Sequence, residues 1–373
     1  MPKVSIIMPM LNSIKYLKEC MDSVINQTLI DIEIIPVDAG STDGTLELLE
    51  EYANKDNRIK ILHSDKKSMG YQYNLGMEIA TGDYIGFVES DDYVVANMFE
   101  TLWKYAEKYQ VEWVKANYNF FMQYPTGRQM LPVGIIKKCG YDQVFRPSDY
   151  PTQIYFDVYM WPGIYRTSFI REHKIKLNET PGASFQDAGF VLQSYMYAER
   201  AMYIDEYLYC YRRDNQASSA HQVKAILFGI NEVEYMSDII KKDENLYKHF
   251  WGTFYKKSMS FFLDFYKRLP VLSECNSEIY DALIRWCNFF VGEMERDELF
   301  WSNNVFAHFG VEMSFLQEGI EAFDCYYRRM FSEENKNLRK TINKILERRK
   351  IVIFGCGNNG LGILSLLLRL NKK

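Results

Sequence analysis

Four short apolar runs stand out in the first ninety residues of the chain. They occupy residues 4–9, 32–37, 59–63 and 84–88, and each reads as a continuous run rather than as an alternation of apolar and polar positions. Continuous runs of this length are typical of parallel strands that are buried on both faces of a sheet. The pattern therefore predicts four parallel strands in the N-terminal part of the chain.

Helical patterns separate these runs. Between the first two, apolar residues recur at helical spacing from Tyr16 to Ile25, after Asn12 and Ser13, which are both good N-cap residues. The second run leads into residues 41–45, a turn with capping side chains before another helical stripe. This alternation of strands and helices predicts an α/β fold, an open and mostly parallel sheet with flanking helices.

The pattern changes after the first domain, which we place at residues 1–222. Residues 223–350 show helical patterns rich in Trp, Phe and Tyr, which predict an all-α region. Core packing is the default interpretation of these aromatic stripes, although acceptor binding or homo-oligomer formation would also suit them. Residues 351–373 read as a strand, a G-x-G-x-x-G motif and a helix, without the rest of a dinucleotide site. We interpret them as the incomplete start of a Rossmann-like unit.

Composition and charge exclude several classes of protein. The 373 residues are 47% apolar and 25% charged, with a net charge of −5, which is an ordinary globular balance. The chain lacks the long block of Lys and Arg that is typical of nucleic-acid-binding proteins, so we do not expect a nucleic-acid partner. The seven cysteines are scattered without a C-x-x-C pair, which favours reduced thiols in the cytoplasm. We also expect neither a secretion signal nor a membrane span.

Acidic residues follow the predicted strands. Asp38 comes after the second run, Asp65 after the third and residues 89–92, Glu-Ser-Asp-Asp, after the fourth. Ligands of open α/β sheets bind beyond the carboxyl ends of the strands, where these side chains would gather. No glycine-rich phosphate loop follows the first run, and carboxylates repel phosphate unless a cation lies between them. The pattern predicts Mg²⁺ or Mn²⁺, bridging carboxylates to a substrate phosphate.

The alternative for this acidic segment is helix capping. Asp91 and Asp92 could cap a helix that begins near Val94, and a lone Asp pair after a strand would favour that interpretation. The combination of residues 89–92 with Asp38 favours a functional site instead. We nevertheless expect Asp92 to be the capping residue.

Four blocks in this order resemble the family 2 glycosyltransferases of the GT-A fold. They are residues 4–12, 37–45, 74–85 and 89–92, and the resemblance extends over roughly residues 1–220. It implies an inverting transferase that uses a divalent metal and a nucleotide-diphospho-sugar donor, such as a UDP-sugar. The implied acceptor is a glycan or a lipid-linked molecule in bacterial polysaccharide or surface-glycan synthesis. The implied location is the cytoplasm, at the inner face of the membrane through peripheral association.

The resemblance also implies roles for individual residues. Nucleotide-sugar contacts fall on Pro9, Leu11, Asn12, Asp38, Gly40, Asn74, Glu89 and Ser90. Asp91 would hold the metal, and His221 is a second candidate ligand, although an exposed His is the commoner outcome there. Three positions depart from the family pattern: Glu89 replaces Asp, Ala39 replaces a frequent Asp, and Tyr73 replaces a frequent Arg.

An inverting transfer needs one general base to take the proton of the acceptor hydroxyl. The family has this base in an E-D-like pair that opens a helix, and Gln186 and Asp187 stand at that place. The resemblance therefore implies Asp187 as the base, with Gln186 replacing the usual Glu. The alternative is that Asp187 only stabilises the first turn of the helix.

Arg212 completes the set of candidate site residues. Its guanidinium could bind the donor diphosphate, or it could form a structural ion pair with Asp214 or Asp205. Two other functions remain open for the whole chain. One is an NAD(P)-binding or nucleotidyl enzyme that uses the C-terminal glycine motif, and the other is a non-catalytic sugar-nucleotide-binding protein.

Overall fold

The computed structural model describes residues 1–136, 139–183, 185–215, 224–296 and 305–331. The chain forms two compact units, Met1–Thr253 and Phe254–Lys373. The division falls after helix α7 (Ala225–Ile240) and not before it, because α7 packs against α6 (Gln186–Tyr197) of the first unit.

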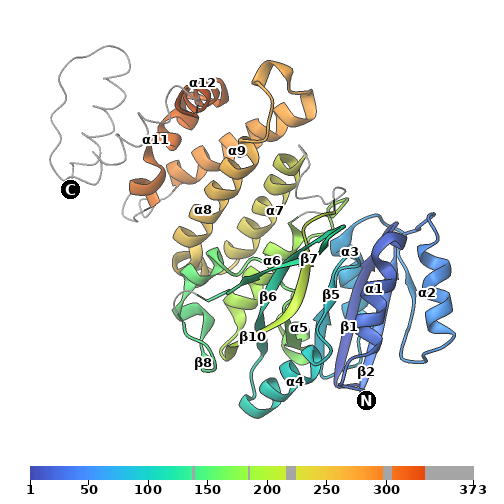
Figure 1. Ribbon diagram of the computed structural model, residues 1–373. Coiled ribbons are helices and arrows are strands. Elements are labelled where there is room, and N and C mark those ends of the chain that lie inside the picture. The colour runs from blue at the N-terminus through green and yellow to red at the C-terminus, as the bar shows by residue number, and fades with distance from the viewer. Residues whose placement is uncertain (137–138, 184, 216–223, 297–304, 332–373) are drawn as a thin grey trace. The chain divides into compact units, whose positions relative to one another are not determined.

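The first unit contains a ten-stranded mixed sheet (Figure 1). Its strands are β1 (Val4–Met10), β2 (Ile32–Asp38), β3 (Leu62–His63), β4 (Tyr84–Phe87), β5 (Tyr93–Val94), β6 (Trp113–Tyr124), β7 (Gly127–Val133), β8 (Val144–Phe145), β9 (Gly163–Arg166) and β10 (Ala201–Arg212). The strand order is β3-β2-β1-β4-β9-β6-β10-β5, with β7 paired to β6 and β8 paired to β10.

The four predicted strands are present and parallel. Every residue of β1, β2 and β4 is buried, as expected for central strands covered on both faces. The third run is shorter than predicted, since only Leu62 and His63 form β3 and Ile59 makes an isolated bridge to Ile34. The antiparallel β9, which lies between β4 and β6, was not predicted.

Helices cover the sheet and continue into the second unit (Figure 1). They are α1 (Ile14–Ile25), α2 (Thr45–Ala53), α3 (Met69–Ile79), α4 (Met98–Tyr109), α5 (Thr167–Glu172), α6, α7, α8 (Glu244–Tyr266), α9 (Ser277–Arg296), α11 (Val305–Glu318) and α12 (Ile320–Phe331). Short 3-10 turns lie at Pro147–Asp149, Pro151–Tyr155 and Leu272–Glu274. Helix α1 buries Leu17, Cys20, Met21 and Val24, the stripe that the sequence pattern predicts.

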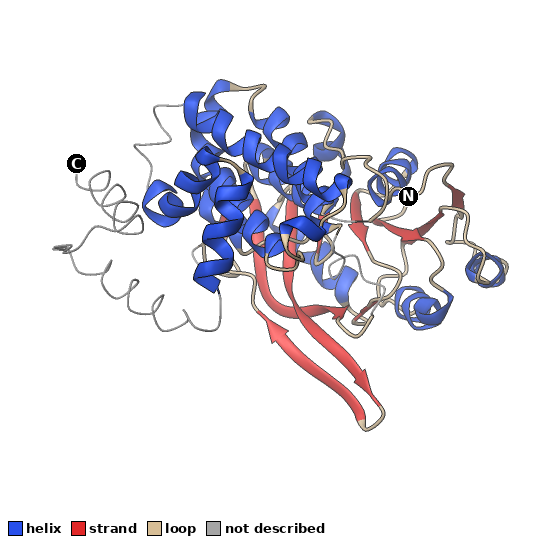
Figure 2. Ribbon diagram, turned by 90° about the horizontal axis from the view of Figure 1, so that it is seen from above, coloured by secondary structure: helices blue, strands red, loops and turns tan. Residues whose placement is uncertain are grey.

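Strands β6 and β7 form a hairpin that extends beyond the helices in the view of Figure 2. Its outer strand β7 is almost entirely exposed, with Leu131 and Met130 among the exposed apolar side chains. Arg128 in the hairpin is held back onto α1, because its guanidinium forms an ion pair with Glu19 at 2.6 Å.

The second unit has a helical, aromatic core. The Phe262 ring lies 5.5 Å from the Trp286 ring, 5.6 Å from the Phe290 ring and 5.2 Å from the Phe323 ring, measured between centroids. These four side chains are fully buried. The described part of this unit contains helices and a 3-10 turn but no strand. These four aromatic side chains therefore pack as core.

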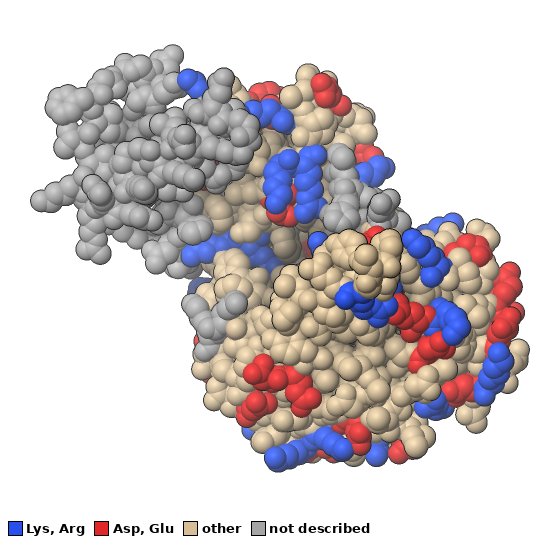
Figure 3. Space-filling model, in the orientation of Figure 1, with Lys and Arg blue, Asp and Glu red and all other residues tan. Residues whose placement is uncertain are grey.

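On the face shown in Figure 3, basic and acidic side chains of the described residues lie in small interspersed groups. Among the described cysteines, six are free thiols and four of these are buried. Within the described residues, the helices are too short or too polar to cross a bilayer.

Candidate active site

The carboxyl ends of β1, β2 and β4 meet at one edge of the sheet, because the strands are parallel and in register. Asp38, the last residue of β2, is 1% exposed. Its Oδ2 accepts hydrogen bonds from the backbone amides of Gly40 at 2.9 Å and Ser41 at 3.0 Å. Gly40 has a φ of +79°, which favours glycine in this tight turn. Asp38 Oδ1 is buried without a hydrogen-bond partner among the described residues, which is unusual for a carboxylate oxygen.

The loop after β1 is joined to the loop after β2 through Asn12. Its backbone amide donates to Ser41 Oγ at 2.9 Å, and its Oδ1 accepts from the amide of Thr42 at 2.9 Å. Its φ of +52° is a left-handed conformation that asparagine tolerates. Leu11 beside it is 39% exposed, whereas Pro9 is buried within β1. The structure thus brings Asn12 to the same edge as Asp38, with its side chain used in shaping the loops.

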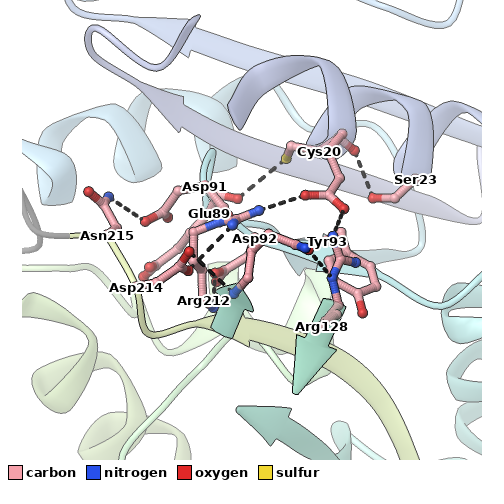
Figure 4. Close-up of polar contacts among 12 residues, drawn as sticks. Cys20, Ser23, Glu89, Asp91, Asp92, Tyr93, Arg128, Arg212, Asp214 and Asn215 are labelled. Carbon is pink, nitrogen blue, oxygen red and sulfur yellow. Dashed lines mark hydrogen bonds and ion pairs between the residues drawn. The ribbon is translucent and has the colours of Figure 1, made fainter. Parts of the chain in front are cut away.

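Three carboxyl groups cluster after β4 (Figure 4). One carboxylate oxygen of each of Glu89, Asp91 and Asp92 lies within 4.8 Å of the others. Burial, and then the charges of Asp91 and Asp187, hold the pKa of Glu89 well above its usual range. Such a set of oxygen ligands suits Mg²⁺ or Mn²⁺, whose charge would offset this repulsion.

The prediction that Asp92 caps a helix near Val94 is wrong. Strand β5 occupies that position, and the next helix, α4, begins at Met98. Asp92 is buried instead, and its carboxylate accepts hydrogen bonds from the Tyr209 hydroxyl and the Arg212 backbone amide, both at 2.8 Å. Asp92 therefore ties the acidic segment to β10, while Glu89 and Asp91 stay partly exposed.

Neighbouring polar groups hold Ser90 and Asp91. The Ser90 hydroxyl is 2.7 Å from that of Ser13, the N-cap residue of α1, whose side chain makes no capping bond. Asp91 Oδ2 accepts from Asn215 Nδ2 at 2.8 Å (Figure 4).

Arg212 lies beside this cluster, within a set of ion pairs (Figure 4). Its guanidinium is 2.6 Å from Glu19 and 3.4 Å from Asp214, and its Nε donates to the Asp91 carbonyl at 2.7 Å. Asp205 instead accepts a hydrogen bond from Asn117. These contacts support the ion-pair interpretation of Arg212, with Asp214 as foreseen. No pattern in the sequence indicated Glu19, because it lies on the polar side of a distant helix.

Asp187 lies in the first turn of α6. This position fits the alternative interpretation, in which its charge only stabilises the helix N-terminus. The residue before the helix, Phe185, has a φ of +66° and its side chain makes no capping bond. Asp187 also acts electrostatically on the acidic cluster, since its charge adds to burial and to the charge of Asp91 in raising the pKa of Glu89. The structure therefore brings Asp187 and the strand-edge carboxylates together.

The contacts of Gln186 give a physical reason for Gln in place of the family's usual Glu. It is buried, and its Nε2 donates to Thr180 O at 3.3 Å, Thr180 Oγ1 at 3.2 Å and Gly182 O at 3.3 Å. An ionised Glu has no proton to give to these carbonyl groups. The amide of Gln186 therefore holds the turn at residues 179–183 against α6.

We expect Gln186→Glu to lower the free energy of unfolding by about 1–3 kcal/mol at pH 7. The substitution would place a buried carboxylate against carbonyl oxygens, which are acceptors as well. Chemical denaturation followed by circular dichroism measures the change. The matched control is Gln110→Glu, the same substitution at an exposed position. An equal loss of stability in both variants would show that the contacts of Gln186 are not the cause.

Tyr73 and Asn74 are consecutive residues of α3. Asn74 exchanges hydrogen bonds with the backbone of Leu177, both at 2.9 Å, and donates to Glu179 at 3.1 Å. The Tyr73 hydroxyl is buried without a partner among the described residues, and burial and the charges of Glu89 and Asp187 raise its pKa. Asn74 thus fixes the segment that leads to the turn at residues 179–183.

Two features predicted from the sequence lie outside the described residues. They are the candidate ligand His221 and the glycine motif of residues 351–373.

The comparisons with known proteins agree with this geometry. The chain matches the family model described as "Glycosyl transferase family 2" over residues 5–169. It is 34% identical to the Bacillus subtilis protein named "Uncharacterized glycosyltransferase EpsJ", over 57% of this chain and 62% of EpsJ. It is 31% identical to glycosyltransferase GlyG of Streptococcus pneumoniae, over 56% of this chain and 70% of GlyG. The match with EpsJ spans less than two thirds of that protein's length.

The crystal structure of S. aureus TarS 1–349 has the same fold, with a TM-score of 0.66, 19% identity and coverage of 91% of this chain and 92% of that one. This match confirms the predicted α/β fold class. Together with GlyG, the family match shows that this chain belongs to glycosyltransferase family 2.

Proposed function

We propose that this chain is a metal-dependent, inverting glycosyltransferase that transfers a sugar from a UDP-sugar to a hydroxyl group of a glycan or a lipid-linked acceptor. The observation that carries the proposal is the cluster of Glu89 and Asp91 at the carboxyl edge of the sheet, with Asp187 close enough for its charge to raise the pKa of Glu89. One carboxylate would serve as base while the others hold a cation. The relatives are bacterial glycosyltransferases, and the setting that we propose is the one that the family resemblance implies, bacterial polysaccharide or surface-glycan synthesis.

The nucleoside would lie against the loops after β1 and β2. Asp38 Oδ1 is a buried acceptor without a partner among the described residues, which suits an N–H or hydroxyl donor of the nucleoside. The loop at Asn12 and the exposed Leu11 would border the same ligand. Of the solved structures with this fold, TarS of S. aureus was determined with UDP-GlcNAc, at a TM-score of 0.67, 18% identity and coverage of 91% of this chain and 92% of that one. UDP-GlcNAc is therefore the first donor to test.

Asp91, with Glu89 beside it, would hold Mn²⁺ or Mg²⁺, since their carboxylate oxygens match the ligands that these hard cations prefer. The cation would stabilise the charge that develops on the departing diphosphate. Asp187 would accept the proton of the acceptor hydroxyl as that oxygen attacks the anomeric carbon. Attack on the face opposite the leaving group would give inversion.

Titration calorimetry with UDP-GlcNAc and UDP tests this proposal. We expect both to bind in the presence of Mn²⁺, to lose binding in EDTA, and to regain it when Mn²⁺ is restored. GDP-, CDP- and dTDP-sugars serve as donor controls. Equal binding with and without the metal would contradict the metal requirement. Absence of binding for every sugar nucleotide, together with binding of NAD(P), would favour the enzyme class suggested by the C-terminal glycine motif.

A further inference from the structure

One face of helix α7 lies along the segment that precedes Asp187. Tyr235 Oη donates to the carbonyl of Lys176 at 2.9 Å, and an ideal Cβ at Gly182 would lie 3.8 Å from Phe228 Cζ. Between these contacts, Glu232 reaches the same segment. Residues 228, 232 and 235 are three or four positions apart, so they share one side of the helix. Helix α7 therefore supports residues 176–182 along their length.

Glu232 is the charged member of this face. It is 1% exposed, and its Oε1 accepts from the backbone amide of Gly189 at 2.9 Å, while its Oε2 accepts from Asn178 Nδ2 at 3.1 Å. Among the described residues, no Lys or Arg forms an ion pair with it at 4.0 Å or less. A buried carboxyl group without a cation is costly, and an apolar side chain would fill the same space at lower cost.

Gly189 is shaped to receive this carboxyl group. A Cβ at position 189 would lie 2.3 Å from Glu232 Oε1, so only glycine lets the carboxyl group reach the amide without displacement. Gly189 is two residues after Asp187, in the first turn of α6. The contact therefore anchors the turn that carries Asp187.

Asn178 connects the other carboxylate oxygen to the turn at residues 179–183. Gln186, next to Asp187, holds the far side of that turn through Thr180 and Gly182. Glu232 is thus bonded both to the helix that carries Asp187 and to the segment that borders it.

We propose that Glu232 is a positioning residue, which fixes the first turn of α6 so that Asp187 points at the acceptor hydroxyl. This inference rests on the proposed function, because it takes Asp187 as the base of the transfer. Displacing a reacting group by about 1 Å can cost about 100-fold in rate, so a side chain behind the site can control the chemical step.

The ionisation state of Glu232 determines which substitution preserves its shape and charge best. Burial, and then the charge of Asp187, raise the pKa of Glu232 to about 8. The groups facing it are Asp187 and the Gly189 amide on α6, the Asn178 amide, and Tyr235 on its own helix. At pH 7 most of the carboxyl group is therefore protonated and neutral. Glutamine then has nearly the same shape, carries no charge and keeps an oxygen that accepts from Gly189, but its Nε2 replaces the oxygen that accepts from Asn178.

The experiment compares Glu232→Ala and Glu232→Gln with the wild-type chain at pH 7, with Asp238→Asn as an exposed control on the same helix. Steady-state transfer from UDP-GlcNAc gives kcat and donor KM, and calorimetry with UDP and Mn²⁺ counts the intact donor sites. We expect Glu232→Ala to lower kcat per donor site by about 10- to 100-fold with donor KM unchanged. Glu232→Gln should restore part of kcat, because it keeps the contact with the Gly189 amide and loses the one with Asn178. Asp238→Asn should resemble the wild type.

Gly189→Ala is a second variant, in which residue 232 is still glutamate but its carboxyl group is displaced by the new Cβ. It should lower kcat without changing donor KM. A wild-type kcat per donor site in both Glu232→Ala and Gly189→Ala would overturn the inference. Parallel losses of kcat and donor affinity would overturn it as well, because they indicate a general disturbance of the fold. Failure of the proposed function is distinguishable, since the wild-type chain itself would then not transfer the sugar.

Discussion

Asp187→Asn is expected to reduce sugar transfer by about 100- to 10,000-fold, the range that a general base contributes. The amide has almost the same size but cannot take the proton of the acceptor hydroxyl. Donor binding should persist, because the groups proposed to hold the nucleotide and the metal lie on other loops. The measurement pairs kcat for transfer with calorimetric binding of UDP-GlcNAc in Mn²⁺.

The control for Asp187→Asn separates a base from a helix-terminal charge. Glu47 is an exposed acid in the first turn of α2, far along the chain from Asp187. Glu47→Gln should cost no more than about 0.3–1 kcal/mol of stability and leave transfer unchanged. If Asp187→Asn turns over at nearly the wild-type rate, then Asp187 only stabilises the turn and the base must be sought elsewhere.

Asp91→Asn is expected to remove the metal dependence of donor binding and to lower transfer by about 100- to 1000-fold. A metal ion supplies several kcal/mol of charge stabilisation at the leaving group, and each 1.36 kcal/mol is a factor of ten in rate. The neutral amide offers a weaker oxygen ligand, and it removes one of the three clustered charges. Titration of UDP with and without Mn²⁺ measures the loss.

Asp83→Asn is the matched control for Asp91→Asn. Asp83 is exposed at the other end of β4, so it has the same chemistry without the acidic neighbours. It should bind UDP in Mn²⁺ as the wild type does. Retention of metal-dependent binding in Asp91→Asn would place the metal on other groups.

Much of the edge could be predicted because parallel strands bring their carboxyl ends together by geometry alone. Once the apolar runs predicted β1, β2 and β4, Asp38 and the segment at Glu89 had to meet at one edge. The order of the motif blocks then indicated the family, which the comparisons confirmed. The positions of the strands along the sequence are enough for this prediction, because the residues that follow parallel strands lie at the same edge of the sheet.

The roles of individual side chains could not be predicted in the same way. Asp92 carries the chemistry of a cap, yet it bonds to Tyr209 and the Arg212 amide, which come from a strand more than a hundred positions away. Arg212 pairs with Glu19 from α1 for the same reason. Such contacts depend on which helices and strands become neighbours in the fold. The antiparallel strand β9 joins β4 to β6 in the sheet, and no clear pattern in the sequence indicated it.

The sequence by itself determined the α/β sheet, its acidic edge and the family, because apolar periodicity and motif order are local properties of the chain. Only the tertiary structure decided which acids face the site, which are bound into the core, and that α7 belongs with the sheet. It also placed Glu232 against the turn of Asp187. Burial and hydrogen bonding set the state of each carboxyl group, and both arise only when distant segments pack together.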